Sequence, residues 1–328
     1  MLLDAFSILH ISVMPRQKDP LLTVCIPAYN RPKELETLLQ SVDTERRDIE
    51  YLICEDNSPK RKEIRKTVRS FSSQSKLRIR YHENRVNLGY DANLRNCISL
   101  ATGRFVMFLG DDDWFVPGAL EKFADFAANH RDSAYIFRSY AMRRSDGQTE
   151  IFRYFVKPTE LPPGLETATF LFKRSVSLGG ITFRRDLCQK LAREDFDGTL
   201  LYQLYLCAAI TLGHSGVACH FPVVEMAQTY RKDQPMFGQS SAEKKFFAPG
   251  SVTPQNSINF TKGFFTIAEY FDITYKVPFS LAVRQDLSRY AYPFLSIQRK
   301  RGAITFLRYA INLARETRIN QTWHYYAY

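Results

Sequence analysis

The chain has 328 residues, of which 45% are hydrophobic, and its 45 basic residues outnumber its 34 acidic ones to give a net charge of +11. This composition suits one sizeable α/β domain with a smaller appendage and excludes a disordered tail. A basic balance favours anionic partners such as nucleotide phosphates, anionic lipid headgroups or nucleic acid, but it does not choose among them.

The cysteines and the apolar runs indicate the cellular compartment of the protein and whether it spans a membrane. Six cysteines are scattered without a C-x-x-C pair, so zinc is not expected and a reducing, cytoplasmic compartment is predicted. No apolar stretch reaches the roughly 18–20 residues that a membrane span needs. Residues 1–20 resemble a signal peptide only loosely, because Asp4 stands where a basic residue is usual, and they are predicted to be a short extension.

Strand-like and helix-like runs alternate through the first third of the chain. Alternation at this spacing is typical of βαβ units, and it predicts an open, mostly parallel sheet with helices on both faces. The predicted strands are 22–28, 49–54, 77–82 and 104–109, and the predicted helices between them are 32–42, 60–71 and 93–101.

Polar clusters follow three of these predicted strands. They are Tyr29-Asn30-Arg31, Glu55-Asp56-Asn57 and Asp111-Asp112-Asp113. In open parallel sheets, ligands bind beyond the carboxyl ends of the strands. We therefore expect the three clusters to meet on one rim and to form a ligand site.

The pattern is looser after residue 135. The sheet domain is predicted to span 21–225, followed by a linker or mobile loop at 226–255 that is rich in Pro, Gly, Ser and Gln, and by a helical region at 256–328. Further elements are predicted as strands at 135–142 and 181–185 and as helices at 200–212, 278–290 and 303–315.

The acidic triplet is the sharpest chemical signal. Three adjacent carboxylates repel one another unless cations neutralise them, and hard divalent cations prefer carboxylate oxygens and often bridge to substrate phosphates. A plain polar turn is the alternative interpretation.

Asp56 is positioned to accept hydrogen bonds from a ribose or base, and no Gly-rich phosphate loop follows the first strand. Gly89 permits a tight turn, and Asp91 is a plausible helix N-cap.

Four segments together resemble the family 2 glycosyltransferases. They are TVCIPAYNR, ICEDNS, NLGYDANLRNCISLATG and FVMFLGDDDWFVPGAL, and they cover about residues 21–125 in the family's order. The segment Ser177–Gly180 extends the resemblance. Within the family, the chain is most similar to bacterial enzymes that build O-antigens and other surface polysaccharides, the abequosyltransferase-like subgroup in particular. The resemblance implies a GT-A (Rossmann-like) fold and metal-dependent transfer from a nucleoside-diphosphate sugar to a glycan or lipid-linked glycan.

The resemblance also implies roles for the residues at the rim. Pro27, Ala28 and Tyr29 match the loop that packs on the nucleotide base, and Arg31 matches a nearby polar position. Asp56 matches the acid that bonds the base.

The third and fourth segments supply the remaining implied contacts. Asn93 is grouped with the nucleotide-binding residues. Asp112 and Asp113 match the acidic pair that holds ribose and metal (Mn²⁺ or Mg²⁺), with Asp113 as the more direct ligand. Asp111 joins the nucleotide-binding set at a position that varies in the family, and Gly110 stands where an Asp is often found.

One departure concerns the catalytic base. Inverting members carry a Glu-Asp pair after a Gly-Phe-Asp-like segment, whereas Tyr202 and Gln203 stand here in its place. Asp197 and Asp195 are the nearest carboxylates and are the predicted general bases, although either could simply cap the next helix. His214 and His220 are weaker alternatives. A catalytically inactive GT-A module that binds a nucleotide sugar or glycan therefore stays open as an alternative function.

The C-terminal region is basic and aromatic. A basic amphipathic helix can lie on an anionic membrane surface, which suits a lipid-linked acceptor and peripheral contact with the inner face of the cell membrane. The alternative is a helical cap whose charges point to water. No nucleic-acid partner is expected, because no RNA-binding signature is present.

Overall fold

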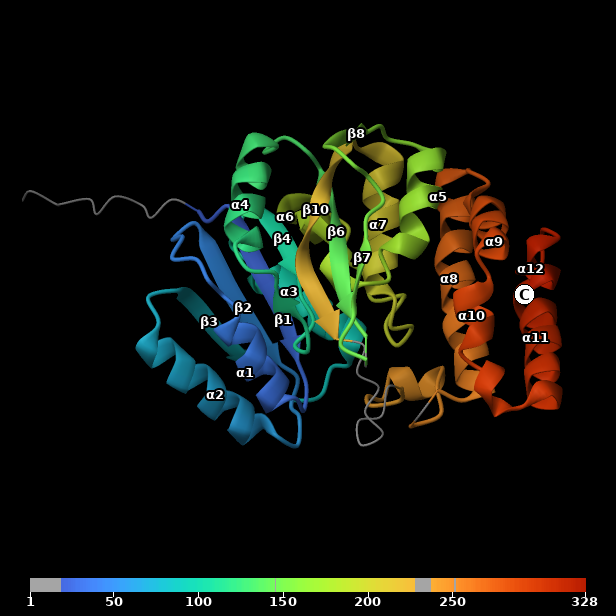
Figure 1. Cartoon of the computed structure of the whole chain (residues 1–328), viewed down its shortest axis with the longest axis horizontal. Helices are drawn as coiled ribbons and strands as arrows, with labels where there is room; N and C mark the ends of the chain where they lie inside the picture. The colour runs from blue at the N-terminus through green and yellow to red at the C-terminus, as the bar shows by residue number, and fades with distance from the viewer. Residues whose placement is uncertain (1–18, 145, 228–236, 251) are drawn as a thin grey trace, which may run out of the picture.

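The computed structural model describes residues 19–144, 146–227, 237–250 and 252–328, and these form one mixed α/β fold (Figure 1). Most of the predicted extension at 1–20 and part of the predicted linker lie outside the described residues. The described strands join in one sheet in the order β3-β2-β1-β4-β9-β6-β10-β5, with β7 beside β6 and β8 beside β10. Their bounds are β1 Leu22–Ala28, β2 Ile49–Glu55, β3 Arg78–Glu83, β4 Phe105–Phe108, β5 Trp114–Phe115, β6 Tyr135–Arg143, β7 Thr149–Phe152, β8 Thr159–Leu161, β9 Ile181–Arg184 and β10 Gly216–Ala227.

The strands that carry the predicted rim run in the same direction. β1 pairs in parallel with both β2 and β4, and β2 pairs in parallel with β3. Their carboxyl ends therefore lie at one edge of the sheet. β9 is antiparallel to both of its neighbours, β4 and β6, so the sheet is mixed beyond β4. The predicted α/β fold and its parallel strands β1 to β4 are confirmed, whereas five of the nine strand pairings in the described chain are antiparallel.

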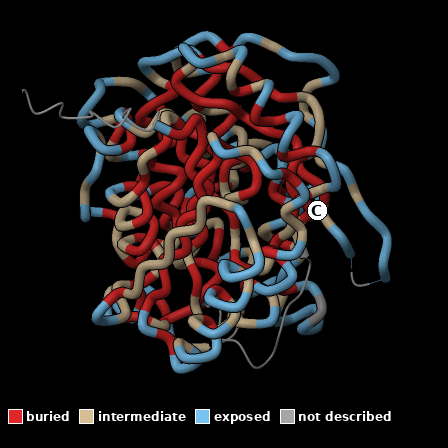
Figure 2. Tube along the Cα trace, turned by 90° about the vertical axis from the view of Figure 1, so that its left-hand side faces the viewer, coloured by how far each residue is buried: buried red, intermediate tan, exposed pale blue. Residues whose placement is uncertain are grey.

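Helices cover both faces of the sheet, because alternate side chains of each buried strand point to opposite sides. Val24 and Ile26 of β1 pack with α1, α2 and α4, whereas Cys25 packs with α3 and α7 in a second core. Figure 2 shows this buried interior as a continuous red centre. The described helices are α1 Pro32–Gln40, α2 Arg61–Gln74, α3 Tyr90–Leu100, α4 Ala119–Asn129, α5 Leu165–Arg174, α6 Arg185–Lys190, α7 Tyr202–Gly213, α8 Pro254–Tyr275, α9 Phe279–Arg289, α10 Tyr292–Ser296, α11 Ala303–Thr317 and α12 His324–Ala327, with short 3₁₀ turns η1 Leu178–Gly180, η2 Glu243–Lys245 and η3 Arg299–Arg301.

The C-terminal helices share the core of the sheet domain. Phe172 of α5 lies edge-on to Phe264 of α8, with ring centroids 6.0 Å apart, and to Phe279 of α9 at 5.1 Å. Aromatic pairs of this kind contribute beyond their buried area. α8 to α12 are therefore an integral part of the fold rather than a detached tail. No helix in the described part of the chain is long and apolar enough to span a bilayer.

We expect Phe172→Ala to lower the free energy of unfolding by about 3–5 kcal/mol, because it opens a cavity where α5, α8 and α9 meet. Denaturant unfolding followed by circular dichroism measures this loss. Phe246→Ala is the matched control, because that ring is 41% exposed and its removal should cost less than about 1 kcal/mol. An equal, small loss in both variants would contradict a shared core.

Candidate functional site

A cavity of about 260 Å³ opens at the carboxyl ends of β1, β2 and β4. Asp56 and two members of the acidic triplet, Asp111 and Asp112, line the same cavity, which is the juxtaposition predicted from the sequence. A space of this size, walled by apolar and carboxylate groups together, suits a small polar ligand. The lining residues are Pro27, Ala28, Tyr29, Asn30, Arg31, Asp56, Asn87, Gly89, Tyr90, Asn93, Gly110, Asp111, Asp112, Leu178, Leu200, Gln239 and Glu243.

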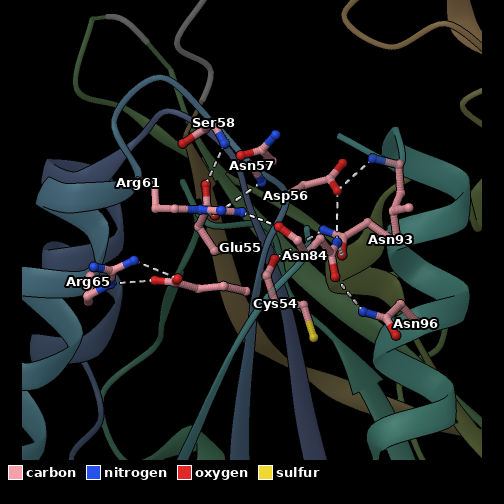
Figure 3. Close-up of polar contacts among 12 residues, drawn as sticks. Cys54, Glu55, Asp56, Asn57, Ser58, Arg61, Arg65, Asn84, Asn93 and Asn96 are labelled. Atoms are coloured by element: carbon pink, nitrogen blue, oxygen red, sulfur yellow. Dashed lines mark hydrogen bonds and ion pairs between the residues drawn. The ribbon is translucent and has the colours of Figure 1, made fainter. Parts of the chain in front are cut away.

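Asp56 is held by a network of amides and backbone N–H groups (Figure 3). Its Oδ1 accepts hydrogen bonds from Asn84 Nδ2 and Leu88 N, both at 2.8 Å, and its Oδ2 accepts one from Gly89 N at 2.9 Å. Asn93 completes the network, since its Oδ1 accepts from Asn84 and its Nδ2 donates to Cys54 O. The carboxylate is thus fixed in one orientation toward the cavity wall.

Burial raises the pKa of Asp56 above its usual value, although the three hydrogen bonds act in the opposite direction. Oδ2 accepts a single hydrogen bond from the described residues, and a carboxylate oxygen can accept two. A ligand N–H group that reached Oδ2 would relieve the cost of burying this charge. Oδ2 of Asp56 is therefore oriented so that it could accept one more hydrogen bond.

Among the described residues, Arg31 pairs with two members of the acidic triplet. Arg31 Nη1 lies 3.0 Å from Asp111 Oδ1 and 2.8 Å from Asp112 Oδ2. The backbone N–H of Tyr29 donates to the other oxygen of Asp111 at 3.0 Å. These contacts join the loop after β1 to the turn after β4. Burial and the neighbouring Asp112 raise the pKa of Asp111 to about 6, against the opposing pull of Arg31.

Asp113 lies beside the cavity rather than in its lining, and it is 6% exposed. Burial, together with the adjacent Asp112 and Asp111, raises its pKa well above its usual value. A Cβ atom on Gly110 would lie 3.0 Å from both Asp112 Oδ1 and Asp113 Oδ2. Two carboxylate oxygens thus flank the backbone of Gly110.

These donors fit a hard divalent cation, since such cations prefer carboxylate oxygens and three crowded carboxylates repel one another. In the part of the chain that the structure describes, no three His, Cys, Asp or Glu side chains are placed to hold a metal ion together. A cation at Asp112 and Asp113 would therefore need further oxygen ligands from a bound diphosphate or from water.

Asp91 differs in role from the N-cap that the sequence predicts. Gly89 is the N-cap of α3, and Asp91 lies in the first turn. Its Oδ2 accepts hydrogen bonds from Gly198 N and Leu200 N at 2.9 and 2.8 Å, and its Oδ1 accepts one from Tyr202 N at 2.9 Å. Asp91 therefore shapes the loop before α7, from which Leu200 lines the cavity.

One wall of the cavity comes from the stretch predicted to be a linker. Glu243 is 3% exposed and accepts hydrogen bonds from Tyr90 N at 3.2 Å and Gln239 N at 2.8 Å. A Cβ atom on Gly89 would lie 2.3 Å from Ser240 Oγ, so only glycine permits this close approach. Residues 237–250 are therefore packed onto the turn before α3.

Comparison with known proteins assigns the chain to a family. The sequence model of the glycosyl transferase family 2 matches residues 23–191, just over half of the chain. This protein is a member of that family. The matched region carries Asp56 and the whole acidic triplet, so the cavity lies where the resemblance implied the family's site.

Curated relatives share the same part of the chain. The chain is 30% identical over 120 residues to an uncharacterised glycosyltransferase, MJ1057, of Methanocaldococcus jannaschii, which covers 36% of this chain and 41% of that protein. It is 32% identical over 101 residues to the abequosyltransferase RfbV of Salmonella typhimurium, covering 30% of each. It is 28% identical over 192 residues to a GalNAc(5)-diNAcBac-PP-undecaprenol β-1,3-glucosyltransferase of Campylobacter jejuni, covering 57% of this chain and 60% of that enzyme.

These matches span 30% to 60% of the three relatives' own lengths.

Among solved structures, residues 1–349 of TarS from S. aureus, in complex with UDP-GlcNAc, superpose with a TM-score of 0.59 at 15% identity, covering 91% of this chain and 82% of that one. This likeness establishes the GT-A fold predicted from the sequence.

The two predicted general bases of this family 2 chain do not line the cavity. Asp197 forms an ion pair with Arg95, and Asp195 forms one with Arg193 at 2.7 Å while 59% of its side chain is exposed. The alternatives His214 and His220 also lie outside the cavity lining. A catalytic role for Asp195 or Asp197 remains a prediction.

Several lining residues were missed by sequence reasoning. Asn87 and Tyr90 belong to a quoted segment and were within reach of a motif argument. Leu200, Gln239 and Glu243 come from loops without a recognisable motif, and only the folded chain brings them to the cavity.

Asp91 makes the stability of this protein depend on pH. Burial raises its pKa to about 7 in the folded protein, from 3.8 in the unfolded chain, despite the opposing backbone hydrogen bonds. Between these two values the folded form binds more protons, so the free energy of unfolding should fall as the pH rises. The advantage of the wild type over Asp91→Asn should therefore shrink by roughly 2–4 kcal/mol between about pH 4 and pH 8.

Urea unfolding across this pH range measures the effect. Asp195→Asn is the control, because Arg193 lowers the pKa of Asp195 instead of raising it. This variant keeps Asp91, so its free energy of unfolding should still fall as the pH rises. A constant difference between wild type and Asp91→Asn would show that Asp91 is ionised throughout.

Proposed function

We propose that this chain transfers a sugar from a nucleoside-diphosphate sugar to a hydroxyl of a glycan or lipid-linked glycan, in the synthesis of a surface polysaccharide. The observation that carries the proposal is that Asp56 and two members of the acidic triplet, Asp111 and Asp112, line one cavity at the ends of adjacent parallel strands, with Asp113 beside it. Membership of family 2 supports the reaction class. The relatives RfbV and the Campylobacter glucosyltransferase support polysaccharide synthesis as the context.

The nucleotide would occupy the part of the cavity nearest to β1 and β2. Pro27, Ala28 and Tyr29 would pack on the base, and Asp56 would accept a hydrogen bond from it. Asn93 would act through Asn84, which it helps to orient against Asp56. Arg31 and Asp111 would fix the edge of the cavity by their mutual ion pair.

The sugar diphosphate would lie against the turn after β4. Asp112 would hold the ribose and, with Asp113, would bind Mn²⁺ or Mg²⁺. When bound, the cation stabilises the negative charge on the departing diphosphate. The raised pKa of Asp113 supports this assignment, since a cation would favour the ionised carboxylate.

We infer that Asp197, rather than Asp195, is the general base. Asp197 is three residues before Leu200, which lines the cavity, and its side chain is 21% exposed. Asp195 is largely in solvent. A general base must come within hydrogen-bond reach of the acceptor hydroxyl, so Asp197 would have to leave Arg95 when the acceptor binds.

The acceptor and the location of the protein complete the proposal. A lipid-linked acceptor would place the chain at the inner face of the cell membrane as a peripheral protein, with its catalytic domain in the cytoplasm. A catalytically inactive module that binds a nucleotide sugar or glycan is the alternative, and the Tyr202 and Gln203 substitution of the expected acid pair favours it. Turnover separates the two functions.

We expect one class among UDP-, GDP-, CDP- and dTDP-sugars to raise the melting temperature by several degrees at about 100 times its Kd, and more so with Mn²⁺. Asp56→Asn should weaken binding of that sugar nucleotide by about tenfold or more, because it replaces an acceptor oxygen with a donor N–H group. Asp113→Asn should remove the gain from Mn²⁺ and keep metal-free binding. Asp195→Asn is the control. The proposal fails if no sugar nucleotide shifts the melting temperature.

We expect Asp197→Asn to lower kcat for transfer by about 100-fold or more while leaving the Kd of the sugar nucleotide unchanged, because loss of a general base acts on the chemical step. Asp195→Asn should retain kcat. Steady-state transfer assays with isothermal titration of the nucleotide measure both quantities. An active Asp197→Asn enzyme would exclude this assignment, and nucleotide binding without turnover in the wild type would favour the inactive module.

A further inference from the structure

The outward face of α11 carries apolar side chains that the described structure leaves at least half exposed. Ile304, Leu307 and Ile311 are 71%, 60% and 50% exposed. On the opposite face of the same helix, Tyr309 and Leu313 are buried. With 3.6 residues per turn, Ile304, Arg308, Ile311 and Arg315 follow one line along the outward face. The helix is therefore apolar on two faces, and only one of them is covered.

This face belongs to a larger exposed apolar region. Of the sixteen large hydrophobic residues that are exposed in the described part of the chain, ten fall within residues 281–328. Trp323 and Tyr326, next to and within α12, are 71% and 70% exposed. Figure 1 shows α11 and α12 at the end of the molecule opposite to α2 and β3. Exposed apolar surface concentrated at one end marks a docking site.

The charge around this face is positive. Residues 284–328 contain eight Lys and Arg residues and two acidic ones, Asp286 and Glu316. Both acids are already paired with lysines that precede this region, Asp286 with Lys173 at 3.5 Å and Glu316 with Lys262. Among the described residues, no acidic group lies within ion-pair distance of Arg308 or Arg315. An occupant with negative charge would therefore complement this face.

We propose that the face formed by Ile304, Leu307, Arg308, Ile311 and Arg315, the α11 face, docks on the surface of an anionic lipid bilayer. The apolar side chains would enter the boundary between headgroups and acyl chains, and the arginines would extend their charged ends to lipid phosphates. Exposed Trp and Tyr side chains suit the same interfacial depth. The proposal deepens the proposed function, on which it rests for the choice of a lipid-linked acceptor.

A second copy of the chain fits this face less well. Pairing two α11 faces would bring Arg308 and Arg315 of both copies into one contact without an acid on either side. Desolvating unpaired like charges costs more than the apolar contact would return. A bilayer that contains anionic lipid supplies the missing charge and lets the arginines stay hydrated.

Co-sedimentation with vesicles tests the proposal on the full chain. We expect binding to vesicles of phosphatidylcholine with phosphatidylglycerol and little binding to phosphatidylcholine alone. Arg308→Gln with Arg315→Gln should weaken binding by about 25-fold, roughly fivefold for each arginine, and should flatten its salt dependence. Ile304→Gln, Leu307→Gln and Ile311→Gln together should weaken it by at least about tenfold, and Gln keeps the helix propensity of the segment.

The control is Ile151→Gln with Val156→Gln, at two sites in the sheet domain that are 49% and 82% exposed. It should bind vesicles as the wild type does. Equal binding to both kinds of vesicle, no binding, or equal losses in the control and the α11 variants would each overturn the proposal. So would a dimer, detected by light scattering, that the three Gln substitutions dissociate.

Melting temperature and sugar-nucleotide binding are measured for every variant. Both should match the wild type, because the α11 face contributes no residue to the cavity. Failure of vesicle binding with intact nucleotide binding would then count against the α11 face alone. Failure of nucleotide binding in the wild type would count against the proposed function alone.

Discussion

The structure of this site depends on placing several carboxylates at one buried edge of a parallel sheet. Parallel pairing of β1 with β2 and β4 brings Asp56 and the acidic triplet together, and burial then makes their charges costly. The four carboxylates differ in the partners that offset this cost of burial. Asp56 receives three hydrogen bonds, Asp111 and Asp112 share Arg31, and the pKa of Asp113 is raised well above its usual value by burial and by Asp112 and Asp111. Carboxylates gathered at one edge suit a divalent cation, which could in turn bind a diphosphate.

Buried charged side chains also occur around the cavity. Asp91 is a buried carboxylate that is used for backbone architecture, since its three hydrogen bonds shape the loop that leads into α7. Arg138 of β6 has the opposite charge and is fully buried, and its Nη2 donates to Ile181 O at 3.0 Å and Leu178 O at 3.3 Å. Burial lowers its pKa to about 9, while Asp113 acts to raise it. Arg138 thus secures the segment of Leu178, which lines the cavity.

The C-terminal half adds walls and surfaces to this centre. Glu243 and Gln239 close the cavity over the turn at Gly89, and the aromatic contacts of Phe172 anchor α8 and α9 to the sheet domain. α11 is then held with one face against this core and the other open. Under the proposals made above, a bilayer contact at α11 and a sugar-nucleotide site at the sheet edge would be rigidly linked, because a single core connects them.

The first four strands and three helices could be predicted from the sequence to within a few residues, because each buried strand is a short apolar run and each helix has an apolar stripe. β1 was predicted at its observed bounds, Leu22–Ala28. α4, α5 and β10 were not predicted, although Pro117-Gly118 precedes α4 and Pro162-Pro163-Gly164 precedes α5. The sequence by itself determined the βαβ order, the acidic clusters and the family, since these are properties of neighbouring residues. Only the tertiary structure decided the role of Asp91, the cavity wall at Glu243 and the engagement of Asp197 by Arg95, because each joins groups far apart in the chain, and local patterns carry no information on such contacts.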